Sequence, residues 1–315
     1  MMTEITSSQD IAYALALSPD FARDGVCFVA RASGLYRTND GGATWRSAYD
    51  ALNLEAPLVT TAVAVSPLFS SDASVFCGVS GAILRSADRG QTWQATLLPP
   101  PPTPVSTFVI SPAYAEDGTV LAATLEDGVY ATDDRGDHWM PWSFGLMDLN
   151  VLCLAISPDY AADETVFAGT ESGVFRSTNG GRAWRETDFP MECAPVLSLA
   201  VSPDLARDGS VWAGTEEHGL FHSRDGGKTW QQLGRGQITD AINAILLSAT
   251  VSSVVDVLVV QAGTLIVSRD GGRSWAPWRN GLSYDEGLAC VAAPFGLYAG
   301  APLLVGLATG DVRRV

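Results

Sequence analysis

Six copies of one eight-residue pattern recur along the chain at a nearly constant period. Each copy reads Ser/Thr-x-Asp-x-Gly-x-x-Trp, except that the fourth copy has Asn in place of Asp. The closing tryptophans are 48, 46, 45, 46 and 45 residues apart. A fixed period of this size indicates an array of one supersecondary unit. The recurring residues are Asp40, Asp88, Asp134, Asn179, Asp225 and Asp270, with Trp45, Trp93, Trp139, Trp184, Trp230 and Trp275.

The octapeptide is typical of a tight turn that leads into a strand. A short carboxylate or amide accepts hydrogen bonds from backbone N–H groups just downstream. The glycine two residues later suits a positive φ, and the tryptophan offers a large surface to bury. A calcium site is the alternative, but calcium takes about six to eight oxygen ligands, whereas each copy has only one or two carboxylates. We therefore interpret the octapeptide as structural and predict no metal site.

Each repeat begins with a short apolar run, which favours a strand buried on both faces. The seven runs are Ala12 to Ser18, Val59 to Ser66, Val105 to Ser111, Val151 to Ser157, Val196 to Ser202, Ile242 to Ser248 and Leu288 to Ala293. A polar turn, a second strand, a short turn and a third strand follow. The octapeptide then leads into a fourth strand. No helical period is visible, so every unit is predicted to be four short strands.

The number of units decides the architecture. After the sixth octapeptide, three further strand-like segments occur, at 288–293, 303–308 and 310–313, and the sequence stops one strand short of a unit. The segment from Met2 to Ser7 precedes the first complete unit. We expect it to pair beside residues 311–315, because a closed ring hides the strand edges that an open array would expose. The predicted fold is all-β, a seven-bladed β-propeller of four-stranded antiparallel blades that forms a single domain over residues 1–315, with an N-terminal strand completing the last blade.

Composition limits the partners and the compartment. The formal net charge of −16 argues against nucleic acid and anionic membranes, which require a positive footprint. No run approaches the ~20 apolar residues of a membrane helix, and residues 1–10 do not resemble a secretory signal. The five cysteines are odd in number without CxxC spacing, and there are three histidines. These features predict a cytoplasmic protein with reduced thiols and no zinc or other cofactor.

The repeats resemble those of the Asp-box (BNR-repeat) propellers, and the resemblance covers essentially the whole chain. That family includes sialidases, xyloglucan-cleaving hydrolases, sortilin-type receptors and photosystem II assembly factors. The resemblance implies that the octapeptides lie on the rim, away from an active face. It does not imply one activity, because function is separable from fold.

A catalytic site is not evident in the sequence. Sialidases of this family have an Arg-Ile-Pro segment and an arginine triad, and this chain has no Arg-Ile-Pro. The first strands, which would line the central channel, contain no Asp, Glu, His, Lys or Arg, so no carboxylate pair is available there for acid–base chemistry. Tyr284, Asp285 and Glu286 could imitate a tyrosine with acidic neighbours. Glu216 and Glu217, with two nearby histidines, suggest a metal site, but strand positions four apart stand ~13 Å from each other, so we favour a solvated turn.

The loops expected at one face of the ring are strongly acidic. They carry Asp50, Glu55, Glu126, Asp127, Asp148, Glu171, Glu192, Glu216, Glu217, Asp285 and Glu286. Trp142 and Trp278 end Trp-x-Pro-Trp segments and add aromatic groups to this face. Acidic loops with aromatic anchors could dock a basic segment of another protein. In the sixth and seventh units, the apolar turns at 249–255 and 294–298 are an alternative interface.

The leading hypothesis is a non-catalytic propeller that serves as a rigid platform, or assembly factor, for another protein. The first alternative is a sialidase-like glycoside hydrolase that uses loop carboxylates. The second is a glycan-binding lectin, which would need similar tryptophan-bearing pockets between several blades. A small-molecule or glycan ligand therefore stays open, and the sequence does not identify the partner.

Overall fold

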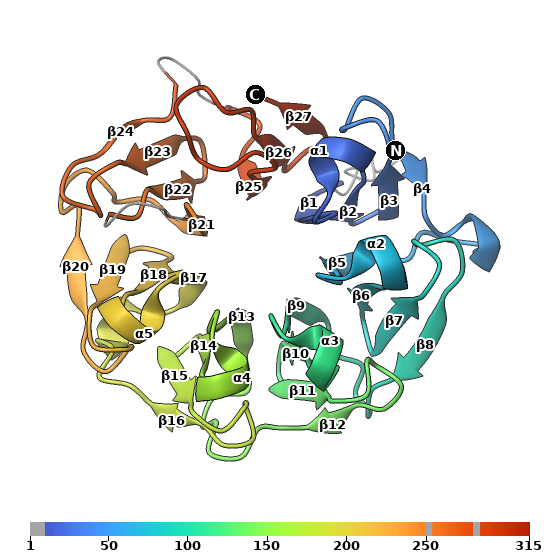
Figure 1. The fold of residues 1–315 in the computed structure, drawn as a ribbon, viewed down its shortest axis with the longest axis horizontal. Helices are drawn as coiled ribbons and strands as arrows, with labels where there is room; N and C mark the ends of the chain where they lie inside the picture. Colours follow the sequence, from blue (N-terminus) through green and yellow to red (C-terminus); the bar gives the residue numbers. More distant parts are fainter. Residues whose placement is uncertain (1–9, 250–253, 280–283) are drawn as a thin grey trace, which may run out of the picture.

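Seven antiparallel sheets stand as blades around a central axis (Figure 1). The computed structural model describes residues 10–249, 254–279 and 284–315. Six blades have four strands in sequence order, and the seventh has three strands within the described residues. The seven-bladed propeller predicted from the repeat is thus confirmed. The expected closing strand, from Met2 to Ser7, lies outside the described residues.

The four positions within a blade have different environments. The innermost strands surround the axis: β1 (Ala12–Leu17), β5 (Thr60–Val65), β9 (Val105–Ile110), β13 (Val151–Ile156), β17 (Val196–Val201), β21 (Ile242–Leu247) and β25 (Leu288–Ala292). The second strands form the core, and most are buried along their whole length: β2 (Cys27–Arg31), β6 (Val75–Val79), β10 (Val120–Thr124), β14 (Val166–Thr170), β18 (Val211–Thr215), β22 (Val257–Gln261) and β26 (Leu304–Leu307). Their continuous apolar runs reflect burial on both faces.

The third and fourth strands lie toward the outside. The third strands are β3 (Gly34–Thr38), β7 (Ala82–Ser86), β11 (Val129–Thr132), β15 (Val174–Ser177), β19 (Leu220–Ser223), β23 (Leu265–Ser268) and β27 (Val312–Arg314). The outer strands are short and mostly exposed: β4 (Arg46–Ser47), β8 (Gln94–Leu97), β12 (Met140–Pro141), β16 (Arg185–Glu186), β20 (Gln231–Leu233) and β24 (Ala276–Pro277).

Five turns contain one-turn helices that the sequence, which shows no helical period, does not predict. One-turn helices connect the first and second strands of blades 1–5: α1 (Phe21–Asp24), α2 (Phe69–Asp72), α3 (Tyr114–Asp117), α4 (Tyr160–Asp163) and α5 (Leu205–Asp208). Four residues are too few to show a 3.6-residue period in the sequence. Two 3₁₀ turns, η1 (Asp50–Leu52) and η2 (Met191–Cys193), occur in links between blades.

Antiparallel pairing gives the ring two faces. The turns between first and second strands and the octapeptide turns fall at the same end of each blade, which we call the turn face. Backbone bonds join the two kinds of turn, as between Gly226 N and Gly209 O at 2.8 Å. The turns between second and third strands and the links between blades lie at the opposite end, which we call the loop face.

Small side chains connect neighbouring innermost strands near the axis. Each innermost strand contains a bulge near its start, where the pairing register shifts. The side chains of six such strands donate hydrogen bonds to the first carbonyl of the next innermost strand. The pairs are Thr61 with Val105, Ser106 with Val151, Cys153 with Val196, Ser198 with Ile242, Asn243 with Leu288, and Cys290 with Ala12. The last pair joins blade 7 to blade 1.

Glycine makes room for some of these donors. Cys153, Ser198 and Cys290 each lie opposite a glycine of the second strand. A Cβ at Gly169 or Gly306 would lie 2.5 Å from the facing Sγ, so any larger residue would collide with the thiol. Burial raises the pKa of the Cys153 and Cys290 thiols to about 12, which keeps both protonated as donors.

Candidate binding surfaces

All six octapeptides close the same hydrogen-bonded turn. In the fifth copy, the Ser223 hydroxyl donates to Asp225 Oδ1 at 2.8 Å and accepts from Gly227 N at 2.8 Å. Asp225 Oδ1 also accepts from Thr229 N, and its Oδ2 accepts from the Thr229 hydroxyl at 2.7 Å. These contacts use the carboxylate oxygens internally. The arrangement therefore accounts for the recurring residues as turn-forming groups.

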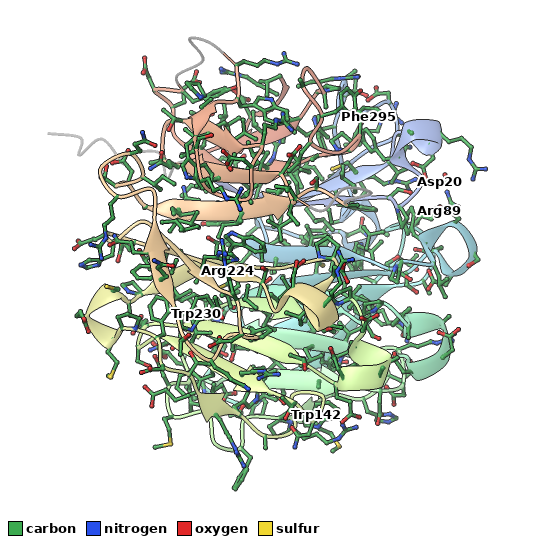
Figure 2. The ribbon with its side chains drawn as sticks, turned by 60° about the vertical axis from the view of Figure 1, so that its left-hand side comes forward. Asp20, Arg89, Trp142, Arg224, Trp230 and Phe295 are labelled. Carbon is green, nitrogen blue, oxygen red and sulfur yellow. The ribbon has the colours of Figure 1, made fainter. Side chains whose placement is uncertain are left out.

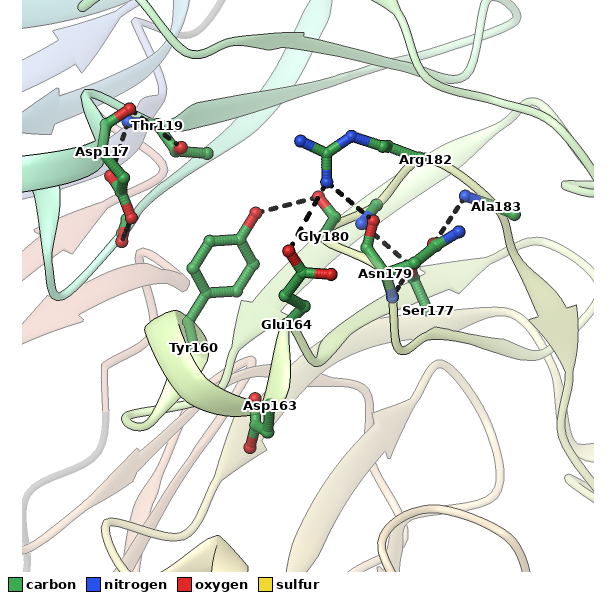
Figure 3. Close-up of polar contacts among 12 residues, drawn as sticks. Asp117, Thr119, Tyr160, Asp163, Glu164, Ser177, Asn179, Gly180, Arg182 and Ala183 are labelled. Carbon is green, nitrogen blue, oxygen red and sulfur yellow. Dashed lines mark hydrogen bonds and ion pairs between the residues drawn. The ribbon is translucent and has the colours of Figure 1, made fainter.

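The fourth copy shows which contacts an amide retains (Figure 3). Asn179 Oδ1 accepts from the Ser177 hydroxyl and from Ala183 N, both at 2.9 Å. The bond to a hydroxyl four residues on is missing because residue 183 is alanine. This copy is also tied to α4, since the Tyr160 hydroxyl donates to Gly180 O at 3.0 Å.

Three of the six closing tryptophans donate a hydrogen bond to the preceding blade. Trp184 Nε1 donates to the carbonyl of Trp142 at 2.7 Å, and Trp230 Nε1 donates to the Thr187 hydroxyl at 3.1 Å. Trp93 Nε1 makes the same kind of bond to Ala48 O. The octapeptide therefore shapes one blade and fastens it to its neighbour.

The acidic loop residues lie at the loop face, because they belong to the turns between second and third strands and to the links between blades. Asp127, Asp148, Glu171 and Glu286 have hydrogen-bond partners there. The other seven have no side-chain partner within the described residues: Asp50, Glu55, Glu126, Glu192, Glu216, Glu217 and Asp285. Unpaired carboxylates at one face produce a negative potential that attracts cations.

Two of the expected anchors are core residues. Trp278 is 9% exposed and Tyr284 is 7% exposed, and both belong to the hydrophobic core of blades 6 and 7. Their neighbours cover them, so each side chain presents little surface to a partner. Trp142 is half-buried at the outer rim, where the Arg182 guanidinium of the next blade lies 4.5 Å from its ring.

The structure exposes other large apolar side chains at the loop face. Met147 is 83% exposed and Met191 is 62% exposed, and Leu54 is 45% exposed. Each directly precedes an acidic residue, giving the pairs Leu54-Glu55, Met147-Asp148 and Met191-Glu192. Sequence reasoning missed them because it looked for aromatic anchors. The apolar–acidic pair that recurs in three links between blades was the sequence signal that could have identified these exposed side chains.

Blades 4 and 5 bring these groups together. Asp148 Oδ2 accepts from Ser172 N at 2.8 Å, joining the link before blade 4 to the β14–β15 turn. The link before blade 5 contacts the β18–β19 turn through Glu216 N and Pro195 O at 3.2 Å. We call this part of the loop face the acidic sector. Its apolar and acidic members are Met147, Asp148, Leu149, Glu171, Met191, Glu192, Glu216 and Glu217.

Two of the three residues suggested for glycosidase chemistry, Glu286 and Tyr284, are otherwise engaged. Glu286 forms two hydrogen bonds of 2.8 Å with Arg313, and the tyrosine beside it is buried. His222 stacks on Trp212 at 4.4 Å, and its burial lowers its pKa to about 4, so the ring is neutral at pH 7. Across the described ranges, no group of three or more His, Cys, Asp or Glu side chains could hold a metal ion.

The turn face also carries apolar side chains at the seventh blade. Tyr298 is 60% exposed and Phe295 is 36% exposed, whereas Leu297 is buried. Figure 2 places Phe295 on the same side of the ring as Asp20 and Arg89. The corresponding turn of blade 6 is described only in part, since residues 250–253 lie outside the described residues.

Comparisons with known proteins agree with the repeat and the fold. Residues 221–232, around the fifth octapeptide, match the BNR/Asp-box repeat model. No curated protein sequence matches the chain. No helix in the described part of the chain is long and apolar enough to cross a membrane.

Three solved structures share the fold at low sequence identity. YCF48 bound to D1 peptide is 17% identical with a TM-score of 0.70, covering 98% of this chain and 92% of that one. An ancestral GH74 enzyme is 17% identical with a TM-score of 0.74, covering 98% of this chain and 45% of the enzyme. The extracellular domain of a B. thetaiotaomicron one-component system is 15% identical with a TM-score of 0.71, covering 98% and 38%. The resemblance to Asp-box propellers is therefore confirmed: the chain is a seven-bladed propeller that carries the BNR/Asp-box repeat.

Proposed function

We propose that the protein is a non-catalytic platform whose acidic sector binds a cationic, partly apolar segment of another protein. The observation that carries this proposal is the combination of exposed methionines with acidic side chains across blades 4 and 5, of which Glu192, Glu216 and Glu217 have no side-chain partner within the described residues. Methionine side chains adapt to varied apolar partners, while carboxylates steer a basic segment toward the surface. A structural neighbour of similar length, YCF48, is bound to a peptide.

Neutralising the acidic sector tests the proposal. We expect the Glu192→Gln/Glu216→Gln/Glu217→Gln variant to lose most of its stoichiometric partner in an affinity pull-down from native cell extract. Binding of the wild type should weaken as salt rises, because exposed charges are screened beyond about 8 Å at 0.15 M ionic strength. A Met191→Ser variant should weaken binding without removing the salt dependence.

A matched control changes the same number of carboxylates on the turn face. Glu116, Asp133 and Asp159 have no side-chain partners within the described ranges, so Glu116→Gln/Asp133→Asn/Asp159→Asn should leave capture unchanged. Equal loss in the two variants would contradict the assignment to the acidic sector. Turnover in a glycosidase panel that disappears on Glu286→Gln would contradict the non-catalytic proposal.

We also propose a cytoplasmic location. All five cysteines are free, and three of them are buried. Thiol labelling of the fractionated cell contents should find reduced cysteines in the cytoplasmic fraction. Recovery of the protein outside the cytoplasm would contradict this location.

A further inference from the structure

Three arginines occupy the same position in different blades. Arg37, Arg85 and Arg176 each directly precede the octapeptide and lie beside a groove at the outer rim. The Nε atoms of all three are buried without a hydrogen-bond partner. The guanidinium of Arg37 lies 5.8 Å from the Phe28 ring, and that of Arg176 lies 5.9 Å from the Phe167 ring. Packing therefore holds these side chains against their own blades.

In blades 1 and 2, the next octapeptide supplies an acceptor for the arginine. Arg37 Nη1 donates to the carbonyl of Arg89 at 2.7 Å. Arg85 Nη1 pairs with the carboxylate of Asp137. The two grooves have volumes of about 310 and 320 Å³. The chain itself thus satisfies both cations.

In blade 4, a cation replaces the carboxylate, and the carbonyl of Gly226, which matches that of Arg89, accepts no bond from the arginine. The residue that matches Asp137 in the fifth octapeptide is Lys228. Arg176 has no hydrogen bond or ion pair within the described chain, although a Cβ at Gly226 would lie 3.7 Å from its Nη1. The groove is larger here, at about 620 Å³, which falls within the ~300–1,000 Å³ of ligand sites.

The charges that line this groove are suited to one negative charge. Arg176, Arg185 and Lys228 are cationic, while Glu186 and Asp188 are anionic, so the lining has a net charge of 3 − 2 = +1 on a chain of net charge −16. A single carboxylate would neutralise the lining and could accept two parallel bonds from a guanidinium. A phosphate dianion would leave excess negative charge beside Glu186 and Asp188.

An aromatic ring forms one wall of the groove. Phe144 is 81% exposed and lines the groove from the link that leaves blade 3. Its backbone is fixed, since Trp184 N donates to Phe144 O at 2.8 Å. A ligand bound to the cations can therefore also cover an apolar surface.

We propose that the groove between blades 4 and 5 binds a carboxylate carried by an apolar or aromatic ligand. This inference goes beyond the proposed platform function, because it concerns another surface and the opposite ligand charge. The carboxylate comes either from a small molecule or from the carboxyl terminus of a polypeptide, and the two sources share the same recognition chemistry.

Lys228 provides a selective probe because it is the only lysine in the chain. Protein labelled with ¹⁵N-lysine should show one backbone amide signal for this residue, which lines the groove. We expect a saturable shift of that signal with N-acetyl-phenylalaninate and none with the neutral N-acetyl-phenylalaninamide. A ten-residue peptide ending in phenylalaninate distinguishes the sources: affinity about 10-fold higher than that of the single residue indicates a polypeptide terminus, and equal affinity indicates a small molecule.

Arginine variants supply the matched controls. Arg176→Gln should weaken binding of N-acetyl-phenylalaninate about 10-fold or more, since bonds to charged groups contribute strongly. Arg176→Lys retains the positive charge but lacks the planar guanidinium. Its affinity for N-acetyl-phenylalaninate should therefore lie between those of the wild type and Arg176→Gln. Arg37→Gln alters the equivalent position of blade 1 and should leave the titration unchanged.

Three results would overturn the site. These are an equal shift with the neutral amide, an unchanged titration in a folded Arg176→Gln variant, and tighter binding of inorganic phosphate than of the carboxylate. The Glu192→Gln/Glu216→Gln/Glu217→Gln variant should titrate like the wild type. The experiments therefore distinguish failure of the proposed carboxylate site from failure of the proposed partner binding at the acidic sector.

Discussion

The turns between first and second strands are held by different means in blade 2 and blade 7. In blade 2, the Ser66 hydroxyl donates to Asp72 Oδ2 at 2.7 Å, and Asp72 Oδ1 accepts from Ser74 N at 2.9 Å. Phe69 lies beneath this pair with no exposed surface. Blades 1, 3, 4 and 5 repeat the serine–aspartate pair.

Blade 7 has no carboxylate in the corresponding turn. Its backbone closes through Gly296 N to Ala293 O at 3.1 Å and Ala301 N to Tyr298 O at 3.0 Å. The turn also relies on blade 1, because the Phe295 ring packs edge-on against Phe21 at 6.1 Å. Local side-chain bonds therefore stabilise the turns of blades 1–5, whereas contacts with a neighbour stabilise the turn of blade 7.

The largest expected difference in stability is between removing the buried Phe69 ring of blade 2 and removing the partly exposed Phe295 ring of blade 7. Phe69→Ala should lower the free energy of unfolding by about 3–5 kcal/mol, because it removes a fully buried ring and leaves a cavity. Phe295→Ala should cost about 1 kcal/mol or less, as its ring is partly in water. Urea unfolding measures both. Equal losses would show that the two turns are equally well anchored.

The serine–aspartate pair should contribute less than the buried ring. Asp72→Ala leaves the Ser66 hydroxyl and Ser74 N without an acceptor, which should cost about 1–3 kcal/mol. In blade 6, Asp256 instead pairs with Arg269 near the surface, so Asp256→Ala should cost only about 0–1 kcal/mol. Thermal unfolding of the two variants provides the comparison. A larger loss at Asp256 would mean that blade 6 has its own essential turn contact.

Acid titration tests whether the octapeptide of blade 5, whose first turn has the serine–aspartate pair, and that of blade 6, whose first turn lacks it, contribute equally to stability. Burial raises the pKa of Asp225, but hydrogen bonds from Thr229 and Ser223 outweigh this effect and lower the pKa to about 2. Hydrogen bonds from the hydroxyl and N–H of Ser274 hold the pKa of Asp270 well below its usual range. A lowered carboxyl pKa stabilises the fold above about pH 4, and this stability is lost as the pH falls toward 2.

Asparagine variants isolate this contribution. Asp225→Asn and Asp270→Asn each provide an amide oxygen like the one that accepts hydrogen bonds at Asn179, so both variants should fold. Each should be less stable than the wild type at neutral pH, and each difference should shrink between about pH 4 and pH 2. Unfolding midpoints measured across this range give the result. A pH-dependent difference in only one variant would show that the irregular turn of blade 6 also alters its octapeptide.

The sequence predicts the blades well because the repeat is most regular at the residues that determine the backbone conformation of the turns and strands. The period of the tryptophans, the apolar first strands and the turn glycines specify seven blades without knowledge of any contact. The one-turn helices escaped prediction because Ser66 and Asp72 act as a pair only after the chain bends between them.

The surfaces were less predictable because exposure depends on tertiary packing. Trp278 is a core residue because blades 6 and 7 enclose it, and nothing in its Trp-x-Pro-Trp segment distinguishes it from Trp142. The unsatisfied Arg176 became visible only when its blade was compared with those of Arg37 and Arg85. That comparison requires knowing which octapeptide lies beside which arginine.

The bonds between innermost strands have a consequence for how such a ring can arise. Cys290 donates to the Ala12 carbonyl just as Ser198 donates to the Ile242 carbonyl, so in the six junctions that form this bond the donor and the acceptor always face the same way. This is a head-to-tail interface of the kind that closes identical subunits into cyclic oligomers. A duplicated copy of any of blades 3–7 would bring both the donor and the acceptor of the junction with it.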